Sequence, residues 1–99
     1  MRIVNLGDTN SILNKFVAEL RDVDIQKDSL RFRRNVERIG EIMAYEMSKE
    51  LAYSEKQVQT PLGIAPVSTF DDDVVIATVF RAGLPLHAGF LNVFDRADN

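Results

Sequence analysis

The sequence predicts an α/β fold with two N-terminal helices, a β-hairpin arm, one buried core strand and a following helix. Three observations predict it. Apolar residues recur at helical spacing through the first half of the chain. From Tyr53 onward, short polar and apolar stretches separated by turn formers favour strands. A later run of β-branched residues leads into a glycine-containing turn and an apolar helix. We therefore divide the single domain, 1–99, into a helical part (1–52), a hairpin (53–70) and a strand–loop–helix part (71–99).

The helical part is predicted to contain two helices after a brief strand or arm at residues 1–6. The first runs from about Ser11 to Arg21, and its N-cap candidates are Asp8, Thr9 and Asn10. The second runs from about Leu30 to Leu51, with Asp28 or Ser29 as its cap. Gly40 lies inside it at a cost of up to about 1 kcal/mol relative to alanine. Close packing against a neighbour would be a reason to accept that cost.

The hairpin is predicted from two short strands, Lys56–Thr60 and Ile64–Thr69, on either side of a turn at Pro61–Gly63. Pro66 has no amide hydrogen to donate to a strand ladder. We therefore expect the hairpin to lie at an edge.

The run Val74–Phe80 is almost continuously apolar, which is typical of a strand buried on both faces of a parallel sheet. A helix is expected to begin at Pro85 and to run to about Phe94. A parallel strand needs neighbours, and the sequence offers no second strand of this kind. We therefore expect either a fragment of a larger protein or a chain completed by another subunit.

The composition excludes several classes of function. The chain has 45% apolar and 27% charged residues, as in an ordinary globular protein, and its net charge of −3 disfavours general nucleic-acid binding. No apolar run approaches the ~20 residues of a membrane span, and no secretory signal is recognised. There is no cysteine, hence no disulfide and no thiolate metal site. We expect a cytoplasmic protein that binds neither membranes nor nucleic acid.

The turn after the predicted buried strand is a candidate phosphate-binding site. Ligands of open α/β sheets lie beyond the carboxyl ends of strands, where a helix N-terminus offers free amides and partial positive charge. Arg81 would add a forked, permanently charged donor, and Ala82, Gly83 and Leu84 would present their amides. One glycine and one arginine are not specific, so a plain turn with a solvated arginine remains an alternative on this pattern alone.

Several segments together resemble uracil phosphoribosyltransferases. The segment Val79–Leu84 resembles the diphosphate-binding loop of that family. Its early arginine–aspartate segment and its long second helix are matched in the same order by Leu20-Arg21-Asp22, Arg31-Phe32-Arg33, Gly40 and Tyr45-Glu46. Residues 84–99, including His87 and Gly89, resemble one branch of the family.

The resemblance implies the first part of a type I phosphoribosyltransferase. Such an enzyme joins uracil to 5-phosphoribosyl 1-diphosphate and releases uridine monophosphate and diphosphate, assisted by Mg²⁺ whose ligands are not in this chain. It implies that Arg81 and the loop Ala82–Leu84 bind the diphosphate, and that the protein forms homo-oligomers. It also makes Arg31, Arg34 and Arg38 one conceivable contact for an allosteric nucleotide such as GTP.

The family's acidic, Gly/Thr/Ser-rich ribose-phosphate loop and its uracil-recognising segment have no counterpart in this sequence. No catalytic residue is identified, and we expect the 99-residue chain alone to be an inactive transferase. His87 is more often a packed or hydrated residue than a catalytic one at such a position. The alternative function is a small non-catalytic module that dimerises through the hairpin. A nucleic-acid-binding domain that uses the arginine run is disfavoured by the acidic balance.

Overall fold

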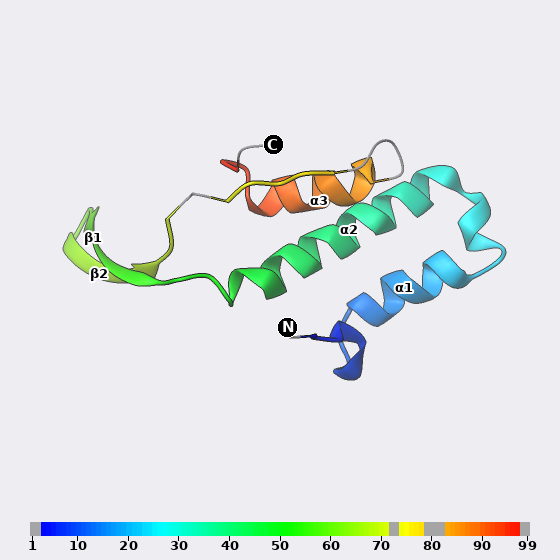
Figure 1. The fold of residues 1–99 in the computed structure, drawn as a ribbon, viewed down its shortest axis with the longest axis horizontal. Coiled ribbons are helices and arrows are strands. Elements are labelled where there is room, and N and C mark those ends of the chain that lie inside the picture. The colour runs from blue at the N-terminus through cyan, green and yellow to red at the C-terminus, as the bar shows by residue number, and fades with distance from the viewer. Residues whose placement is uncertain (1–2, 72–73, 79–82, 98–99) are drawn as a thin grey trace.

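The computed structural model describes residues 3–71, 74–78 and 83–97, and Figure 1 shows their arrangement. The elements in chain order are η1 (Leu6–Asp8), α1 (Leu13–Arg21), η2 (Ile25–Lys27), α2 (Ser29–Ser48), β1 (Ser54–Thr60), β2 (Gly63–Thr69) and α3 (Leu84–Val93). α2 is the central helix, because both α1 and α3 pack against it and not against each other. The predicted order of two helices, a hairpin and a last helix is therefore confirmed.

Local hydrogen bonds set the ends of the first two helices. α1 begins at Leu13, whose amide donates to the Ser11 hydroxyl at 3.2 Å, so this helix starts two residues later than predicted. α2 is capped as predicted, because the Asp28 carboxylate accepts from the Arg31 amide at 3.1 Å. α2 ends at Ser48, three residues before the predicted end, where the Tyr53 hydroxyl donates to the Ser48 carbonyl at 2.8 Å.

Neither the first residues, predicted as a brief strand or an arm, nor residues 74–78 form a strand ladder in the described part of the chain. Residues 3–5 are irregular and η1 follows, held by the Asn5 side chain, which accepts from the Gly7 amide at 3.0 Å. The predicted buried strand is described only over residues 74–78, where a single bridge at Val75 replaces a ladder and Val75 is 72% exposed. Apolar sequence alone does not make a strand, because each strand needs a neighbour to accept and donate its hydrogen bonds. The remaining Val79 and Phe80 lie outside the described residues.

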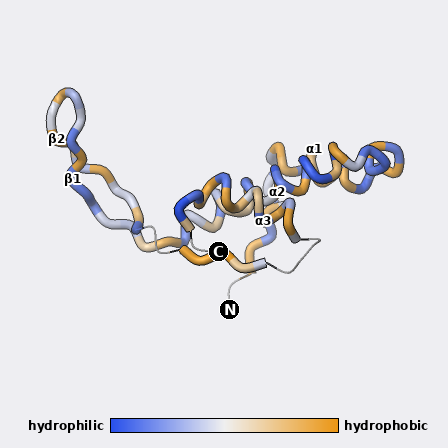
Figure 2. The backbone as a smooth tube through the Cα atoms, turned by 90° about the horizontal axis from the view of Figure 1, so that it is seen from above, coloured by the Kyte–Doolittle hydropathy of each residue, from blue (hydrophilic) through white to orange (hydrophobic). Residues whose placement is uncertain are grey.

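The hairpin is confirmed and is slightly longer than predicted. β1 and β2 pair in antiparallel register from Ser54 opposite Thr69 to Thr60 opposite Gly63. Gly63 has a φ of +127°, a conformation that residues with a Cβ rarely adopt, so the turn requires glycine there. Among the described elements the two strands contact only each other, and Figures 1 and 2 show the hairpin projecting beyond the helices.

The packing of α3 on α2 depends on two glycines that face each other. A Cβ on Gly40 would lie 2.6 Å from the Leu86 carbonyl oxygen and 3.2 Å from the Gly89 Cα. A Cβ on Gly89 would collide with the Glu37 carbonyl oxygen. The two backbones therefore meet directly, and this contact explains the glycine inside α2. Ala44, one turn beyond Gly40, is fully buried.

A buried polar residue joins α1 to α2. Asn35 is 1% exposed, and its side-chain amide donates to a Glu19 carboxylate oxygen at 2.7 Å. The other carboxylate oxygen of Glu19 accepts from Arg31 at 2.8 Å. Arg38 donates to the side-chain oxygen Oδ1 of Asn35 at 3.3 Å and lies over the Phe16 ring. These contacts fix the position of α1 along α2.

The described helices leave much of their apolar surface uncovered. The Cα radius of gyration is 16.7 Å, against about 13 Å for a compact domain of 100 residues. Large apolar side chains of the helices with at least half of their surface exposed include Leu30, Tyr45 and Met47. A domain normally buries such faces between two layers of secondary structure. The described part of the chain supplies essentially one layer of helices.

Candidate functional site

The described end of the candidate phosphate loop is the amino end of α3. Gly83 is the N-cap with φ −77° and ψ −9°, Leu84 is the first helical residue and Pro85 is the second. Any residue adopts these angles, so the conformation of Gly83 is not one that needs glycine. The predicted contacts of Arg81 and Ala82 lie outside the described residues.

The first turn of α3 carries backbone amides that have no acceptor within the helix. No side chain caps Gly83 among the described residues. Leu84 and Leu86 therefore present amide hydrogens, whereas Pro85 has none. Together with the helix dipole they favour a negatively charged group at this end.

His87 lies on the first turn of α3, where its amide donates to the Gly83 carbonyl at 2.9 Å. Its side chain is partly buried, and the enclosed Nδ1 has no hydrogen-bond partner among the described residues. No described carboxylate or carbonyl therefore orients the imidazole as it would orient a general base. This placement favours a packed His87 over a catalytic one.

The three candidate nucleotide-binding arginines contact different partners within the chain. Arg31 and Arg38 face α1, because Arg31 donates to Glu19 and Arg38 lies over the Phe16 ring. Arg34 faces elsewhere and donates to Glu37 at 2.9 Å. Each of the three guanidinium groups thus already has a partner within the chain. The allosteric contact stays a prediction.

Arg33 belongs to the same run of arginines but was not predicted as a site residue. A groove of about 330 Å³ lies between α2 and the amino end of α3, and it is lined by Leu30, Arg33, Arg34, Glu37, Leu84 and Pro85. Among the described residues the side chain of Arg33 forms no hydrogen bond or ion pair, in contrast to its neighbour Arg34. Sequence spacing could not reveal the groove, because it depends on where α3 packs along α2.

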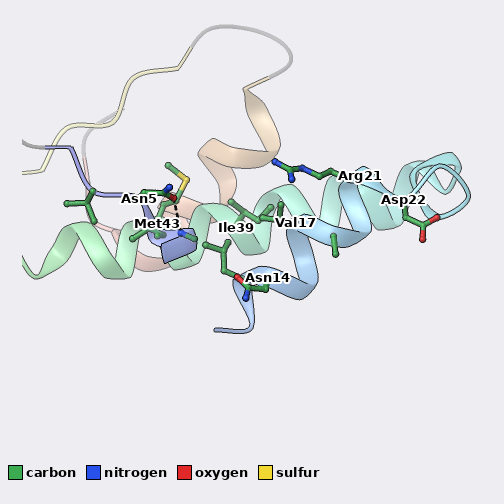
Figure 3. A pocket seen from close by; sticks show the side chains of 12 residues that line it. Asn5, Asn14, Val17, Arg21, Asp22, Ile39 and Met43 are labelled. Atoms are coloured by element: carbon green, nitrogen blue, oxygen red, sulfur yellow. Dashed lines mark hydrogen bonds between the residues drawn. The ribbon is translucent and has the colours of Figure 1, made fainter. Parts of the chain in front are cut away.

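A larger groove of about 920 Å³ lies on another part of the molecule, between the N-terminal segment, α1 and α2 (Figure 3). Its lining is mainly apolar and includes Leu13, Val17, Ile39 and Met43, but no residue of α3. Asp22 lies at one end, where its carboxylate accepts from the Asp24 amide at 2.9 Å and caps the turn. This groove is therefore separate from the candidate phosphate site.

The described residues contain no group of three or more His, Cys, Asp or Glu side chains that could hold a metal ion. Within the same residues, no helix has the length and apolar character needed to span a membrane.

Comparison with known proteins shows which family the chain resembles over most of its length. The family model described as uracil phosphoribosyltransferase matches residues 8–98. A uracil phosphoribosyltransferase of Porphyromonas gingivalis is 57% identical over all 99 residues of the chain, which correspond to 46% of that protein. One of Thermococcus gammatolerans is 35% identical over 92 residues, covering 91% of the chain and 40% of that protein.

A solved structure shares the fold. The AQ2163 protein from Aquifex aeolicus superposes with a TM-score of 0.80 at 25% sequence identity, covering 98% of this chain and 45% of that chain. The chain thus spans less than half the length of the relatives that it matches.

Proposed function

The chain belongs to the uracil phosphoribosyltransferase family, and on this basis we propose that it forms part of an enzyme that converts uracil and 5-phosphoribosyl 1-diphosphate into uridine monophosphate and diphosphate. The observation that supports this proposal is the match over residues 8–98, which includes the whole loop 81–84. Within that enzyme, we assign Arg81 and the amides of Ala82, Gly83 and Leu84 to the diphosphate.

The reaction requires stabilisation of a departing anion. The bond between the anomeric carbon of ribose and the diphosphate oxygen breaks, a bond from that carbon to a uracil nitrogen forms, and this nitrogen loses its proton. Negative charge grows on the diphosphate as it leaves. Fixed amides at the start of α3 and the Arg81 guanidinium would stabilise that charge without having to reorganise during the reaction. No described side chain is assigned to the proton transfer.

Magnesium is part of the same proposal, as an ion that accompanies the diphosphate. The described residues bring together no acidic or imidazole cluster that would hold it, so we assign it no ligand in this chain and no step passes through it. The inactivity of the isolated chain and its cytoplasmic location stay predictions.

Binding of 5-phosphoribosyl 1-diphosphate tests the proposal. Titration into the ¹⁵N-labelled chain should shift the backbone amide signals of Gly83, Leu84 and Leu86. Arg81→Gln should weaken this binding about tenfold, which corresponds to roughly 1.4 kcal/mol, because it removes a charge-assisted bidentate contact.

Ribose 5-phosphate is the matched control ligand, because it keeps the sugar and its phosphate but lacks the diphosphate. It should leave the signals at the start of α3 nearly unchanged. Equal shifts with both ligands, or unchanged affinity in the Arg81→Gln variant, would show that the loop does not recognise diphosphate.

We also propose that the protein forms homo-oligomers through the hairpin. An isolated two-stranded hairpin is marginally stable in water, yet β1 and β2 contact no other described element. Leu62 at the turn is fully exposed, and Ile64 is 67% exposed. Light scattering should therefore give a mass of at least two chains, and replacing both residues by Ser should reduce it. A monomeric mass for the unmodified chain at micromolar concentration would contradict the proposal.

The alternative function was a non-catalytic dimerising module. The family match over residues 8–98 favours the transferase. The exposed hairpin accounts for association under either interpretation.

A further inference from the structure

We infer that Arg33 on α2 is a second cation for the diphosphate at the amino end of α3. This inference rests on the proposed function and goes beyond it, because it adds a binding residue from a different helix. Its starting point is the groove of about 330 Å³ between α2 and the first residues of α3.

The arginines of α2 differ in what they contact. Arg31 donates to both carboxylate oxygens of Glu19, at 3.0 and 2.8 Å. Arg38 donates to Asn35, and Arg34 is paired with Glu37. The side chain of Arg33 has no hydrogen bond or ion pair to any described residue, although its backbone is part of α2. Its fork of donors is therefore available for a ligand, whereas those of the other three already have acceptors.

The charges that line the groove leave an excess of one positive charge. Glu37 is the one acidic residue among the described lining residues and is paired with Arg34 at 2.9 Å. Leu30, Leu84 and Pro85 contribute apolar walls. The groove is open to water, because Arg33 and Leu30 are exposed, so a charge-assisted bond from Arg33 to an anion there should weaken as salt is raised.

The position of the groove indicates which anion Arg33 meets. Leu84 and Pro85 are both lining residues and the first two residues of α3, so the groove adjoins the end that we assign to the diphosphate. Diphosphate has oxygens on two phosphorus atoms. One phosphoryl group can face the amides of Leu84 and Leu86 while the other accepts hydrogen bonds from the planar fork of Arg33.

The test is a titration of inorganic diphosphate into the ¹⁵N-labelled full chain, followed at the amides of Leu84 and Leu86 and at the Arg33 side-chain Nε. We expect shifts at all three in the unmodified chain. Arg33→Gln should raise the dissociation constant about fivefold, and Arg33→Lys, which keeps the charge but loses the fork, should raise it about twofold.

Lys56→Gln is the charge-matched control. Lys56 lies on β1, in the hairpin that projects away from the helices, and pairs with exposed Asp71 at 3.2 Å. It should leave the dissociation constant unchanged. An equal loss in the Lys56→Gln and Arg33→Gln variants would show that only net charge matters and would overturn the inference.

Failure of the inference and failure of the proposed function are distinguishable. If diphosphate shifts Leu84 and Leu86 in the unmodified chain but Arg33→Gln binds as tightly, Arg33 has no part and the proposed loop stands. If diphosphate shifts neither amide, the proposed diphosphate site is wrong and the role of Arg33 falls with it. Arg33 is exposed, so its variants should retain the circular dichroism spectrum of the unmodified chain.

Discussion

Replacing Gly89 by Ala should lower the free energy of unfolding by roughly 2–3 kcal/mol, the upper range for overpacking a tight contact. The new Cβ would collide with the Glu37 carbonyl oxygen and approach the Glu41 amide nitrogen to 2.9 Å. These are backbone atoms of α2, which cannot turn aside as a flexible side chain can. α3 would have to move away from α2 and lose contacts along its length. Urea unfolding followed by circular dichroism measures the change.

Helix propensity alone predicts the opposite sign, because Ala stabilises a helix interior by about 1 kcal/mol relative to Gly. A more stable Gly89→Ala variant would therefore contradict the described packing of α3. Gly7→Ala is the matched control. A Cβ there would lie 3.2 Å from the side-chain oxygen of Asn5, which can shift. We expect that control to change the stability by less than about 0.5 kcal/mol.

The regular elements that depend on local sequence were the predictable part of this fold. The stripe of apolar residues and the Asp28 cap located α2, and the turn formers located the hairpin. The run that begins at Val74 forms one bridge at Val75 and no ladder over residues 74–78, because β-branched composition reports a preference for burial. A strand also needs a hydrogen-bonding neighbour, and that is a property of the rest of the fold.

The candidate site was predictable only as far as it is local. The glycine-containing turn before Pro85 indicated a helix N-terminus, which the structure has at Leu84. The spacing of Arg31, Arg34 and Arg38 placed them on one side of α2, but spacing cannot tell what packs there. Arg31 and Arg38 bind residues of α1 or α2, while Arg33 borders α3. That distinction needs the relative positions of three helices.

Replacing Asn35 by Leu should lower the free energy of unfolding by about 2 kcal/mol, because the partly buried partners of Asn35 would each lose a hydrogen bond. Leu has a similar size, so the change removes two hydrogen bonds and opens no large cavity. Glu19 would lose the amide that donates to it at 2.7 Å, and Arg38 would lose its acceptor. Asn14→Leu is the control, because the exposed side chain of Asn14 bonds, among the described residues, only with exposed Asn10, at 3.1 Å.

The same variant should show a specific dependence on pH. The hydrogen bond from Arg31, followed by that from Asn35, lowers the pKa of Glu19 below its ordinary value of 4.5. A carboxyl group with a lowered folded-state pKa stabilises the fold above its unfolded pKa, and this contribution is lost as the pH falls through the folded value.

Without the Asn35 amide, the folded-state pKa of Glu19 should rise toward the ordinary value. The stability difference between the unmodified chain and Asn35→Leu should therefore be constant near neutral pH and narrow below about pH 4.5. A difference that stays the same down to about pH 3 would show that Asn35 acts through packing alone and not through the charge of Glu19.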